Sequence, residues 1–434
     1  MSQPQLNNAI AIVPLASPPQ VTLRVPGSKS FTNRALLIAA LARGRSVLRG
    51  ALRSDDTRAM AGALRALGIA IAEQNEDGGT RFTVEGQGGT FPVAEADINI
   101  EASGTAARFL TAALTLGNGR YTLDGTARMR QRPIKPLLEA LGQLGATAYS
   151  RDATGCPPVI VEAHGLPGEH CRVRGDLSSQ YLSALLMVAP YAGGGATIEV
   201  VGELVSRPYI GVTMAIMRDF GATVLEDGAR YLVPPGRYAA REYAIEPDAS
   251  SASYFFAAAA LTGGTVRVEG LGRDAVQGDI AFVDILERMG CAVERGDAAI
   301  TVRGPQQLAG IEVDMRAIPD VGQTLAAIAP FASGPVIMHG LGITRHHETD
   351  RLAAVTTELR RLGGAVEERP DGLTIHPVTL HGGTVATYDD HRMAMSFALI
   401  GLRVPGIRIA DPGCVAKTFP DFFERFKLLY RSGM

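Results

Sequence analysis

The first helix of this 434-residue chain opens with PGSKSFTNR, residues 26–34, and continues into the apolar run 35–42. Residues 21–25 predict a strand before it, and the Pro-Gly pair predicts a tight turn between the two. A helix start presents unpaired backbone N–H groups and about half a positive charge, which suits an anion. With Lys29 and Arg34 added there, a phosphate or carboxylate is the expected ligand. The alternative is an ordinary capped amphipathic helix with solvated charges.

Five more stretches combine a small or polar start with an apolar run of helix length. They begin near Ser103, Ser178, Ser250, Asp320 and Asp389. Their spacing of roughly 70 to 75 residues is the kind of period that marks a repeated structural unit. Because each run is apolar nearly all round, each helix is predicted to be buried inside a layer.

A second element recurs between these helices: a strand, a polar loop and an amphipathic helix that ends at a glycine. Strand 336–338 with a helix ending at 359–363 is one example. We therefore predict an α/β (α+β) fold with six repeats of two helices and several strands. Residues 1–20 and 246–434 are expected to form one lobe and residues 21–245 the other, with three repeats each. A cleft between two lobes is the natural place for a small-molecule site.

Composition describes an ordinary globular protein, with 46% hydrophobic and 20% charged residues. The net charge of −2 gives no reason to expect nucleic acid or an anionic membrane as a partner. The four cysteines show no ligand or disulfide spacing and fit a reduced compartment. Neither a signal peptide nor a membrane-spanning window is evident, so we expect a cytoplasmic protein.

Basic residues gather at the predicted helix starts and strand ends. Scattered arginines are usually solvated surface charges, but the mouth of a buried helix is a poor place for one. Because arginine binds carboxylate and phosphate through paired hydrogen bonds, such a set would hold a polyanionic substrate pair. The set comprises Lys29, Arg34, Arg108, Arg128, Arg130, Arg132, Arg207, Arg351, Arg392 and Lys417.

Carboxylates stand beside these cations at Asp320, Glu348, Asp350 and Asp390. A carboxylate near cations usually only balances charge, and Asp320 has the position of a helix N-cap. A proton-transfer reaction, however, needs at least one base and one acid in such a place. Both interpretations stay open on the residues alone.

Two other kinds of site are not supported. His346 and His347 are adjacent and no third ligand is spaced for zinc, so we expect no metal. Ser28 stands where a phosphate-binding loop GxxxxGK[ST] requires glycine, which argues against a nucleotide-dependent kinase.

Motifs in every repeat carry a resemblance to a known family. They are PGSKSxxNR at 26–34, SGTAAR at 103–108, RxxxRP at 128–133, SSQ at 178–180, DASSA at 248–252, ETDRL at 348–352, YDDHRMAM at 388–395 and DPGCVAKTFP at 411–420. Together they are specific, and the chain resembles the 5-enolpyruvylshikimate-3-phosphate synthase family. The resemblance implies a two-lobed inside-out α/β barrel of six βαβαββ repeats, whose buried parallel helices point their N-termini into the cleft.

The resemblance also implies 3-phosphoshikimate 1-carboxyvinyltransferase activity, a step of the shikimate pathway in chorismate and aromatic amino-acid biosynthesis. The enolpyruvyl group of phosphoenolpyruvate would move to the 5-hydroxyl of shikimate 3-phosphate, with release of phosphate. By motif, shikimate 3-phosphate would be held by Lys29, Ser30, Arg34, Ser178, Ser179, Gln180, Ser206, Asp320 and His347. Phosphoenolpyruvate would be held by Lys29, Gly104, Arg128, Gln180, Arg351, Arg392 and Lys417.

The implied catalytic residues are Asp320, Glu348 and Lys29. Asp320 would take the 5-hydroxyl proton and Glu348 would protonate the methylene carbon, giving a tetrahedral intermediate that then loses phosphate. Lys29 and the arginines would stabilise the developing charge; which of the three makes each proton transfer stays open. The family requires neither cofactor nor metal. We expect small-molecule substrates as the only partners, a monomer, and sensitivity to the herbicide glyphosate.

Three residues depart from the pattern of many relatives. Phe109 stands where proline is common, Ile343 where a polar asparagine is common, and His347 where lysine is common. The histidine predicts that one phosphate or hydroxyl contact depends on pH. None of the three is a residue on which the implied chemistry depends.

Two alternatives remain from the sequence. The enolpyruvyl transferase that acts on UDP-N-acetylglucosamine shares the fold, but it has a cysteine in the loop that corresponds to about 123–133, where this chain has none. A non-catalytic anion-binding protein would use the same scaffold. Asp320 and Glu348 argue against it, since a binder of anions gains nothing from carboxylates.

Overall fold

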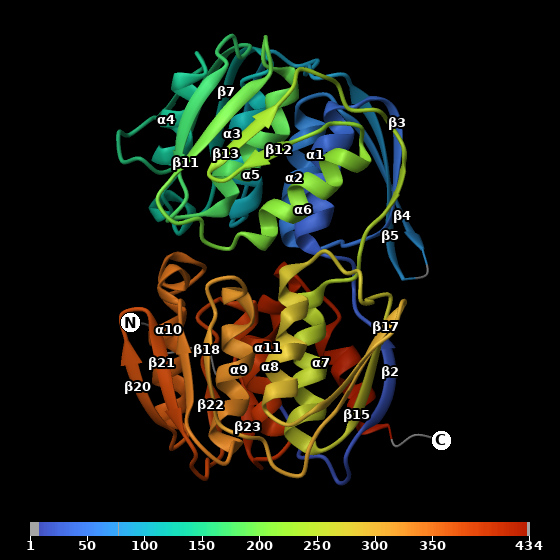
Figure 1. The fold of residues 1–434 in the computed structure, drawn as a ribbon, viewed down its shortest axis with the longest axis vertical. Helices are drawn as coiled ribbons and strands as arrows, with labels where there is room; N and C mark the ends of the chain where they lie inside the picture. The colour runs from blue at the N-terminus through green and yellow to red at the C-terminus, as the bar shows by residue number, and fades with distance from the viewer. Residues whose placement is uncertain (1–7, 77, 432–434) are drawn as a thin grey trace. The chain divides into compact units, whose positions relative to one another are not determined.

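The computed structural model describes residues 8–76 and 78–431, and its backbone contacts divide the chain into two compact units. Unit 1 consists of Met1–Pro26 and Pro247–Met434, and unit 2 of Gly27–Glu246 (Figure 1). The first boundary falls after Pro26 rather than after residue 20, because strand β2 (Gln20–Arg24) pairs with β15 (Thr265–Glu269) of unit 1. Each unit is described by itself below.

The described strands of unit 2 form three four-stranded sheets with one common strand order. In each sheet the first two strands are parallel, and the strands that follow are antiparallel to their neighbours. The orders are β14 (Glu242–Ala244), β3 (Arg43–Ala51), β5 (Gly79–Gln87), β4 (Ala70–Glu76); β6 (Glu95–Asn99), β7 (Asn118–Asp124), β9 (Val159–His164), β8 (Thr147–Ser150); and β10 (His170–Arg174), β11 (Ala196–Val201), β13 (Arg230–Val233), β12 (Leu225–Asp227).

The described part of unit 1 repeats this order in two four-stranded sheets and shortens it in a three-stranded one. The orders are β2, β15, β17 (Ala299–Arg303), β16 (Ala292–Arg295); β18 (Ile311–Asp314), β19 (Val336–His339), β21 (Gly372–His376), β20 (Ala365–Arg369); and β22 (Gly383–Val385), β23 (Ile407–Ile409), β1 (Ile10–Ala11). The predicted repeat architecture is therefore confirmed. Among the described residues the six sheets stay separate and do not join into one closed hydrogen-bonded barrel.

The apolar runs of the sequence form buried helices inside each unit, as predicted. They are α1 (Lys29–Leu41), α3 (Gly104–Leu114) and α5 (Ser179–Val188) in unit 2, and α7 (Ala249–Thr262), α9 (Gly322–Ile328) and α11 (His391–Gly401) in unit 1. Every residue of α3, α9 and α11 is buried. Within unit 1 these helices pack against one another, and within unit 2 α3 packs against both α1 and α5 (Figure 1).

A second set of helices follows the second strand of each repeat. It comprises α2 (Asp55–Ala66), α4 (Lys135–Gln143), α6 (Pro208–Asp219), α8 (Phe282–Arg288) and α10 (Arg351–Arg361), and the short α12 (Phe422–Phe426) lies near the end of the chain. These helices carry the polar faces that the sequence indicated. No helix in the described part of the chain is long and apolar enough to cross a membrane.

Each time the polypeptide passes from one unit to the other, the last strand before the passage completes a sheet of the unit that the polypeptide leaves. Strand β2 runs directly into α1 along the chain, yet it completes the β15 sheet of unit 1, while β14 runs into α7 and completes the β3 sheet of unit 2. Matching backbone bonds fix both passages: Ser28 N–H donates to Glu246 O within unit 2, and Asp248 N–H donates to Pro26 O within unit 1, each at 2.8 Å. Gly27 is required here, because a side chain would run into the carbonyl oxygen of Gly50.

Candidate active site

The buried helices of unit 2 begin with serine caps. The hydroxyls of Ser28, Ser103 and Ser178 accept backbone N–H bonds from the first turns of α1, α3 and α5 at 3.5, 3.2 and 3.2 Å. A short polar side chain in this place satisfies otherwise unpaired donors of a helix start. The remaining N–H groups and the dipole then make each start a suitable place for an anion.

Side chains join these starts to one another. Gln180 Nε2 on α5 lies 3.5 Å from the Thr105 hydroxyl on α3, and Arg34 Nη2 on α1 lies 3.2 Å from the Ser183 hydroxyl on α5. The sequence-predicted residues of α1, α3 and α5 therefore belong to one face of unit 2. Lys29 lies on this face, with Nζ 3.8 Å from Asp56 Oδ2.

Arg34 is a buried cation that neutral oxygens hold in place. Its guanidinium donates to Thr213 Oγ1 at 2.7 Å, and also to Ser183 Oγ and to the carbonyls of Ser30 and Tyr209. No hydrogen-bond partner of Arg34 in residues 8–76 and 78–431 is a carboxylate. Burial lowers its pKa to about 10, so it still carries its charge at neutral pH.

Phe109, one of the departures from the family pattern, packs against this arginine. The Phe109 ring centre lies 5.0 Å from Arg34 Cζ, a cation–π distance, and the Tyr209 ring lies at 5.9 Å. The residue that replaces a common proline thus forms a wall behind a cation of the candidate site.

Gly104 begins α3 beside two buried arginines. A Cβ atom at this position would lie 2.6 Å from Arg108 Nη1 and 2.7 Å from Arg132 Nη1, so any side chain would displace them. Arg108 itself donates to the carbonyls of Gly104 and Pro133 at 3.0 and 2.9 Å. Arg128 differs from this pair, because its side chain is exposed and donates to Gln131 Oε1 at 3.3 Å.

Other predicted residues of unit 2 lie at the same helix starts or near them. Ser30 is half-buried in the first turn of α1, and Ser179 is buried in the first turn of α5. Ser206 precedes α6 with a φ of 51°, a left-handed conformation that is strained for serine and concentrates at functional positions. Arg130 and Arg207 do not belong to the site: both are exposed and pair with Asp124 and Glu226.

The candidate residues of unit 1 form a chain of alternating charges. Asp320 lies between two guanidinium groups, 3.0 Å from Arg351 Nη1 and 2.9 Å from Arg392 Nη2. Glu348 in turn lies between Arg351 Nη2 and Lys417 Nζ, at 2.9 Å from each. The order is Arg392, Asp320, Arg351, Glu348 and Lys417, which unites every catalytic or phosphoenolpyruvate-binding residue that the sequence predicted in this half of the protein.

Helix starts position this chain of charges. Asp390 is the N-cap of α11 and accepts the Arg392 N–H at 2.8 Å, and it also accepts Arg351 Nε at 2.8 Å. Burial alone would lower the pKa of Arg351, but Asp390, Glu348 and Asp320 together raise it above its ordinary value. Arg351 therefore remains a permanent cation at the centre of the cluster.

His347 joins the same cluster, whereas Ile343 does not. Arg351 Nη1 lies 3.0 Å from His347 Nδ1, and since arginine can only donate, Nδ1 accepts and the ring proton lies on Nε2. The predicted site histidine thus contacts a cation and lies 3.9 Å from Asp320 Oδ1. Ile343 is half-buried in the short helix η7 (Gly342–His346) and adds no polar group.

A strained turn precedes α11. Tyr388 and Asp389 both have a φ of 56°, although neither is glycine. The fully buried Glu358 of α10 holds this turn, because it accepts the Tyr388 hydroxyl at 2.8 Å and the Ala386 N–H at 3.1 Å. Such strain persists only where surrounding contacts enforce it, and it is common beside active sites. Sequence reasoning missed Glu358, since its role depends on a contact between two repeats.

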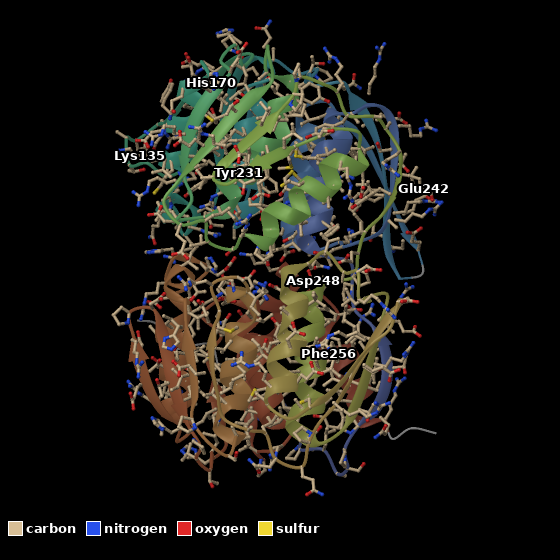
Figure 2. All side chains as sticks on the ribbon, viewed as in Figure 1. Lys135, His170, Tyr231, Glu242, Asp248 and Phe256 are labelled. Carbon is tan, nitrogen blue, oxygen red and sulfur yellow. The ribbon has the colours of Figure 1, made fainter. Side chains whose placement is uncertain are left out.

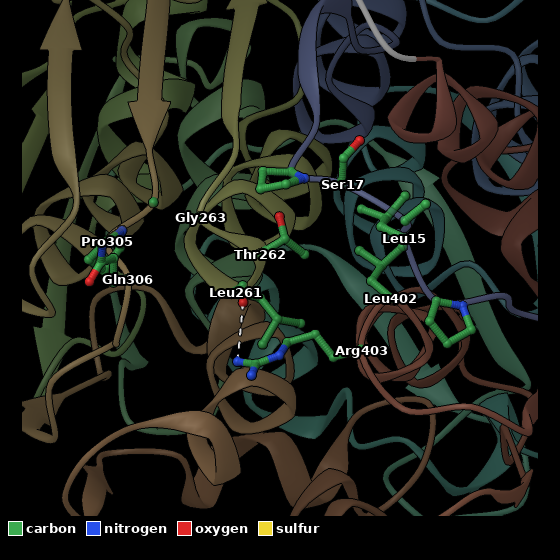
Figure 3. Close-up of a pocket in the computed structure, with 13 residues that line it drawn as sticks. Leu15, Ser17, Leu261, Thr262, Gly263, Pro305, Gln306, Leu402 and Arg403 are labelled. Atoms are coloured by element: carbon green, nitrogen blue, oxygen red, sulfur yellow. Dashed lines mark hydrogen bonds between the residues drawn. The ribbon is translucent and has the colours of Figure 1, made fainter.

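A surface pocket of about 520 Å³ lies elsewhere in unit 1 (Figure 3). It is lined by residues 14–18 and by the ends of α7 and α11, including Thr262 and Arg403. Asp248 marks the other end of α7 (Figure 2), and this 14-residue helix spans about 20 Å. The pocket therefore lies a helix length away from Asp320 and its partners.

The fold and these two faces define an α/β protein that gathers cations and carboxylates at the starts of its buried helices. Comparison with known proteins gives the family. Residues 16–426 match the family model of EPSP synthase (3-phosphoshikimate 1-carboxyvinyltransferase), and the chain belongs to this family.

Relatives agree over nearly the whole length. The 3-phosphoshikimate 1-carboxyvinyltransferase of Nostoc sp. (strain PCC 7120) is 49% identical over 421 residues, which cover 96% of this chain and 99% of the relative. The protein of the same name from Ralstonia pickettii is 48% identical over 418 residues, covering 93% and 96%. The structure of EPSP synthase from Acinetobacter baumannii is similar with a TM-score of 0.82, 26% identity and 98% coverage of both chains. The enolpyruvyl transferase NikO from Streptomyces tendae, 20% identical with a TM-score of 0.76 and 95% coverage of both chains, shares the fold.

Proposed function

We propose that this protein catalyses the EPSP synthase reaction. The enolpyruvyl group of phosphoenolpyruvate is transferred to the 5-hydroxyl of shikimate 3-phosphate, and phosphate is released. The observation that carries this proposal is the alternating chain of Arg392, Asp320, Arg351, Glu348 and Lys417. It places two carboxylates, as candidate base and acid, among cations that suit an anionic substrate.

The helix starts of unit 2 would bind shikimate 3-phosphate. Its phosphate needs donors and positive charge, which Ser178, Ser179 and Arg34 provide without a carboxylate that competes for the guanidinium. Lys29 is the cation of this face that would also reach the second substrate. Gln180 and Ser206 would contact the remaining oxygens of shikimate 3-phosphate.

The cations of unit 1 would bind phosphoenolpyruvate, together with Gly104 and Arg128 of unit 2. In this proposal Asp320 removes the proton of the 5-hydroxyl as that oxygen attacks C2, and Glu348 delivers a proton to the methylene carbon. The tetrahedral intermediate then loses its methyl proton and phosphate, while Lys29 and the arginines stabilise the departing anion.

Substrate binding would also make the carboxylates more reactive. Arg392 and Lys417 are engaged by Asp320 and Glu348, each at 2.9 Å. An anionic substrate competes for the same cations, which weakens their hold on the two carboxylates and makes each a stronger base. The site would therefore become competent for proton transfer only when phosphoenolpyruvate is present.

Phosphate release from phosphoenolpyruvate tests the proposed function, with shikimate 3-phosphate and UDP-N-acetylglucosamine as alternative acceptors. We expect release with shikimate 3-phosphate only. Release with the sugar nucleotide alone would identify the other enolpyruvyl transferase. Binding of both small anions without release would indicate a non-catalytic protein.

Glyphosate inhibition gives a second test of the same site. A Cβ at Gly104 would displace the guanidinium groups of Arg108 and Arg132. We therefore expect glyphosate to inhibit the wild type in competition with phosphoenolpyruvate, and Gly104→Ala to weaken both ligands. Equal inhibition of both proteins would exclude this part of the proposal.

A further inference from the structure

A buried carboxyl group lies next to the candidate site of unit 1 without belonging to any family motif recognised in the sequence. Asp279 is on the short helix η4 (Gly278–Ala281), and only 4% of the residue is exposed. Carboxylates are rarely buried to this extent unless they are paired or hydrogen-bonded. Its surroundings therefore indicate what it does.

The segment around Asp279 docks onto the start of α7. Gln277 Oε1 accepts the Ala249 N–H at 3.1 Å, and Gln277 Nε2 donates to the Pro247 carbonyl at 2.6 Å. The Ser250 hydroxyl donates to Asp279 Oδ2. These bonds fix the Asp279 carboxyl at one place beside the N-terminus of a buried helix.

Ser250 connects Asp279 to the chain of charges. Arg392 Nη2 lies 3.5 Å from Ser250 Oγ and 2.9 Å from Asp320 Oδ2. Because the Ser250 proton points at Asp279, the lone pairs of its oxygen are left to face the arginine. The same Nη2 group is thus held from two sides, by Ser250 and by Asp320.

The charged groups around Asp279 give this contact a dependence on pH. Burial, together with the negative charges of Asp320 and Asp248, raises the pKa of Asp279 to about 7, although Arg392 and the Ser250 hydrogen bond oppose this rise. We therefore expect the ionisation of Asp279 to increase between pH 6 and pH 8.5. Its ionisation adds a negative charge near Arg392, which weakens the attraction of that arginine for an anionic substrate.

We propose that Asp279 is a positioning residue that acts through Ser250 to aim Arg392 and to adjust how strongly this arginine attracts phosphoenolpyruvate. The inference rests on the proposed function and deepens it for one substrate. It also predicts that shikimate 3-phosphate, held mainly by unit 2, is affected little.

Steady-state kinetics of four variants test the inference: Asp279→Ala, Asp279→Asn, Ser250→Ala and the control Asp284→Asn. Asp284 lies on the neighbouring helix α8 with its side chain 60% exposed. At pH 6, where the charge of Asp279 matters least, we expect Asp279→Ala to raise KM for phosphoenolpyruvate about tenfold, the effect of losing one hydrogen bond to a charged group. The value of kcat and the KM for shikimate 3-phosphate should change less than about threefold, and Asp284→Asn should match the wild type.

A pH series separates the charge of Asp279 from its hydrogen bond. Asparagine keeps an acceptor for Ser250 but cannot ionise. The KM for phosphoenolpyruvate in the wild type, divided by that of Asp279→Asn, should therefore rise about threefold or more between pH 6 and 8.5. Taking the ratio removes the ionisation of the substrate itself, which is common to both proteins.

A double variant tests the route through Ser250. If Asp279 acts through this hydroxyl, Asp279→Ala combined with Ser250→Ala should raise KM no more than the larger single change. Additive effects would overturn the route, and a constant pH ratio would overturn the role of the charge.

Each remaining outcome is also decisive. If Asp279→Ala leaves the KM for phosphoenolpyruvate unchanged, or changes the KM for both substrates equally, Asp279 has a structural role only. If Asp279→Ala does not fold, the isosteric Asp279→Asn decides through the pH ratio. Absence of phosphate release in the wild type and in Asp284→Asn would instead refute the proposed function, and this inference with it.

Discussion

The two units share one strand order but solve the problem of buried charge in opposite ways. In unit 2, Arg34 is held by hydroxyls, carbonyls and ring faces. In unit 1, Arg351 is held by Asp390, Asp320 and Glu348. A buried cation without a carboxylate partner attracts an external anion, whereas a compensated cluster can exchange partners and protons. One strand order thus carries a buried arginine with neutral partners in unit 2 and a buried arginine with three carboxylate partners in unit 1.

The largest expected effect is the loss of the candidate base in unit 1. We expect Asp320→Asn to lower kcat by about a thousandfold, because general base catalysis contributes on this scale. Asparagine keeps the size of the side chain, so shikimate 3-phosphate should still bind. Phosphate release and calorimetric titration measure the two quantities.

Asp314→Asn is the matched control for this variant, since Asp314 is exposed on β18 and pairs with Arg316. A rate for Asp320→Asn close to that of the control would remove Asp320 from the mechanism. The contrast between the two units would then not extend to catalysis.

Replacement of Lys29 in unit 2 should have the next largest effect. Lys29→Ala removes a cation from a helix start, and we expect kcat/KM for phosphoenolpyruvate to fall about a hundredfold or more. The Asp56 carboxylate, 3.8 Å from Lys29 Nζ, would be left without this ion pair and would repel the substrates. Thermal unfolding of the variant should be close to that of the wild type, and a large shift in Tm would mean that Lys29 is structural.

Removing one arginine from each unit compares the units directly. Arg351→Met leaves Asp390, Asp320 and Glu348 without their shared partner, and it should reduce the free energy of unfolding by about 3 kcal/mol or more. Arg34→Met removes a buried charge that has only neutral partners, so we expect a smaller loss of stability but no detectable binding of shikimate 3-phosphate. Denaturant unfolding and calorimetry provide both values; equal destabilisation would contradict the contrast between the units.

The smallest expected effect concerns the strained turn of unit 1. Glu358→Gln replaces a carboxylate that accepts from Tyr388 and Ala386 with an amide that can accept with one oxygen only. We expect a loss of about 1–3 kcal/mol in the free energy of unfolding, with a modest rise in KM for phosphoenolpyruvate. An unchanged KM would show that the turn does not position Asp390 and Arg392.

Much of this arrangement follows from the sequence, because its signals are local. Apolar runs after small residues predicted the buried helices, and the resemblance to the family implied that Asp320, Glu348, Arg351 and Lys417 belong to one site. The predicted lobe of residues 21–245 placed β14 in the correct unit but also took in most of β2, which belongs to the other unit. Each of these strands runs directly into a helix of the other unit, and only long-range pairing decides which sheet it completes.

Residues whose role depends on burial also escaped the sequence analysis. Asp279 has no neighbours in the sequence that distinguish it from a surface carboxylate, and its partner Ser250 comes from another segment. Glu358 pairs with Arg361 on its own helix, as a surface carboxylate would, but it also accepts the Tyr388 hydroxyl from another segment. Conversely, Arg130 and Arg207 follow the same pattern as the site arginines but are exposed and pair with local carboxylates. The sequence shows which side chains are charged, but only the folded structure shows which of them pair with an opposite charge.

Parallel measurement of shikimate 3-phosphate binding and turnover in Arg34→Met and Asp320→Asn tests the contrast between the units most directly. The account predicts that Arg34→Met abolishes binding, while Asp320→Asn binds within about threefold of the wild type and turns over about a thousandfold more slowly. The opposite pattern, with binding lost in Asp320→Asn and retained in Arg34→Met, would contradict it.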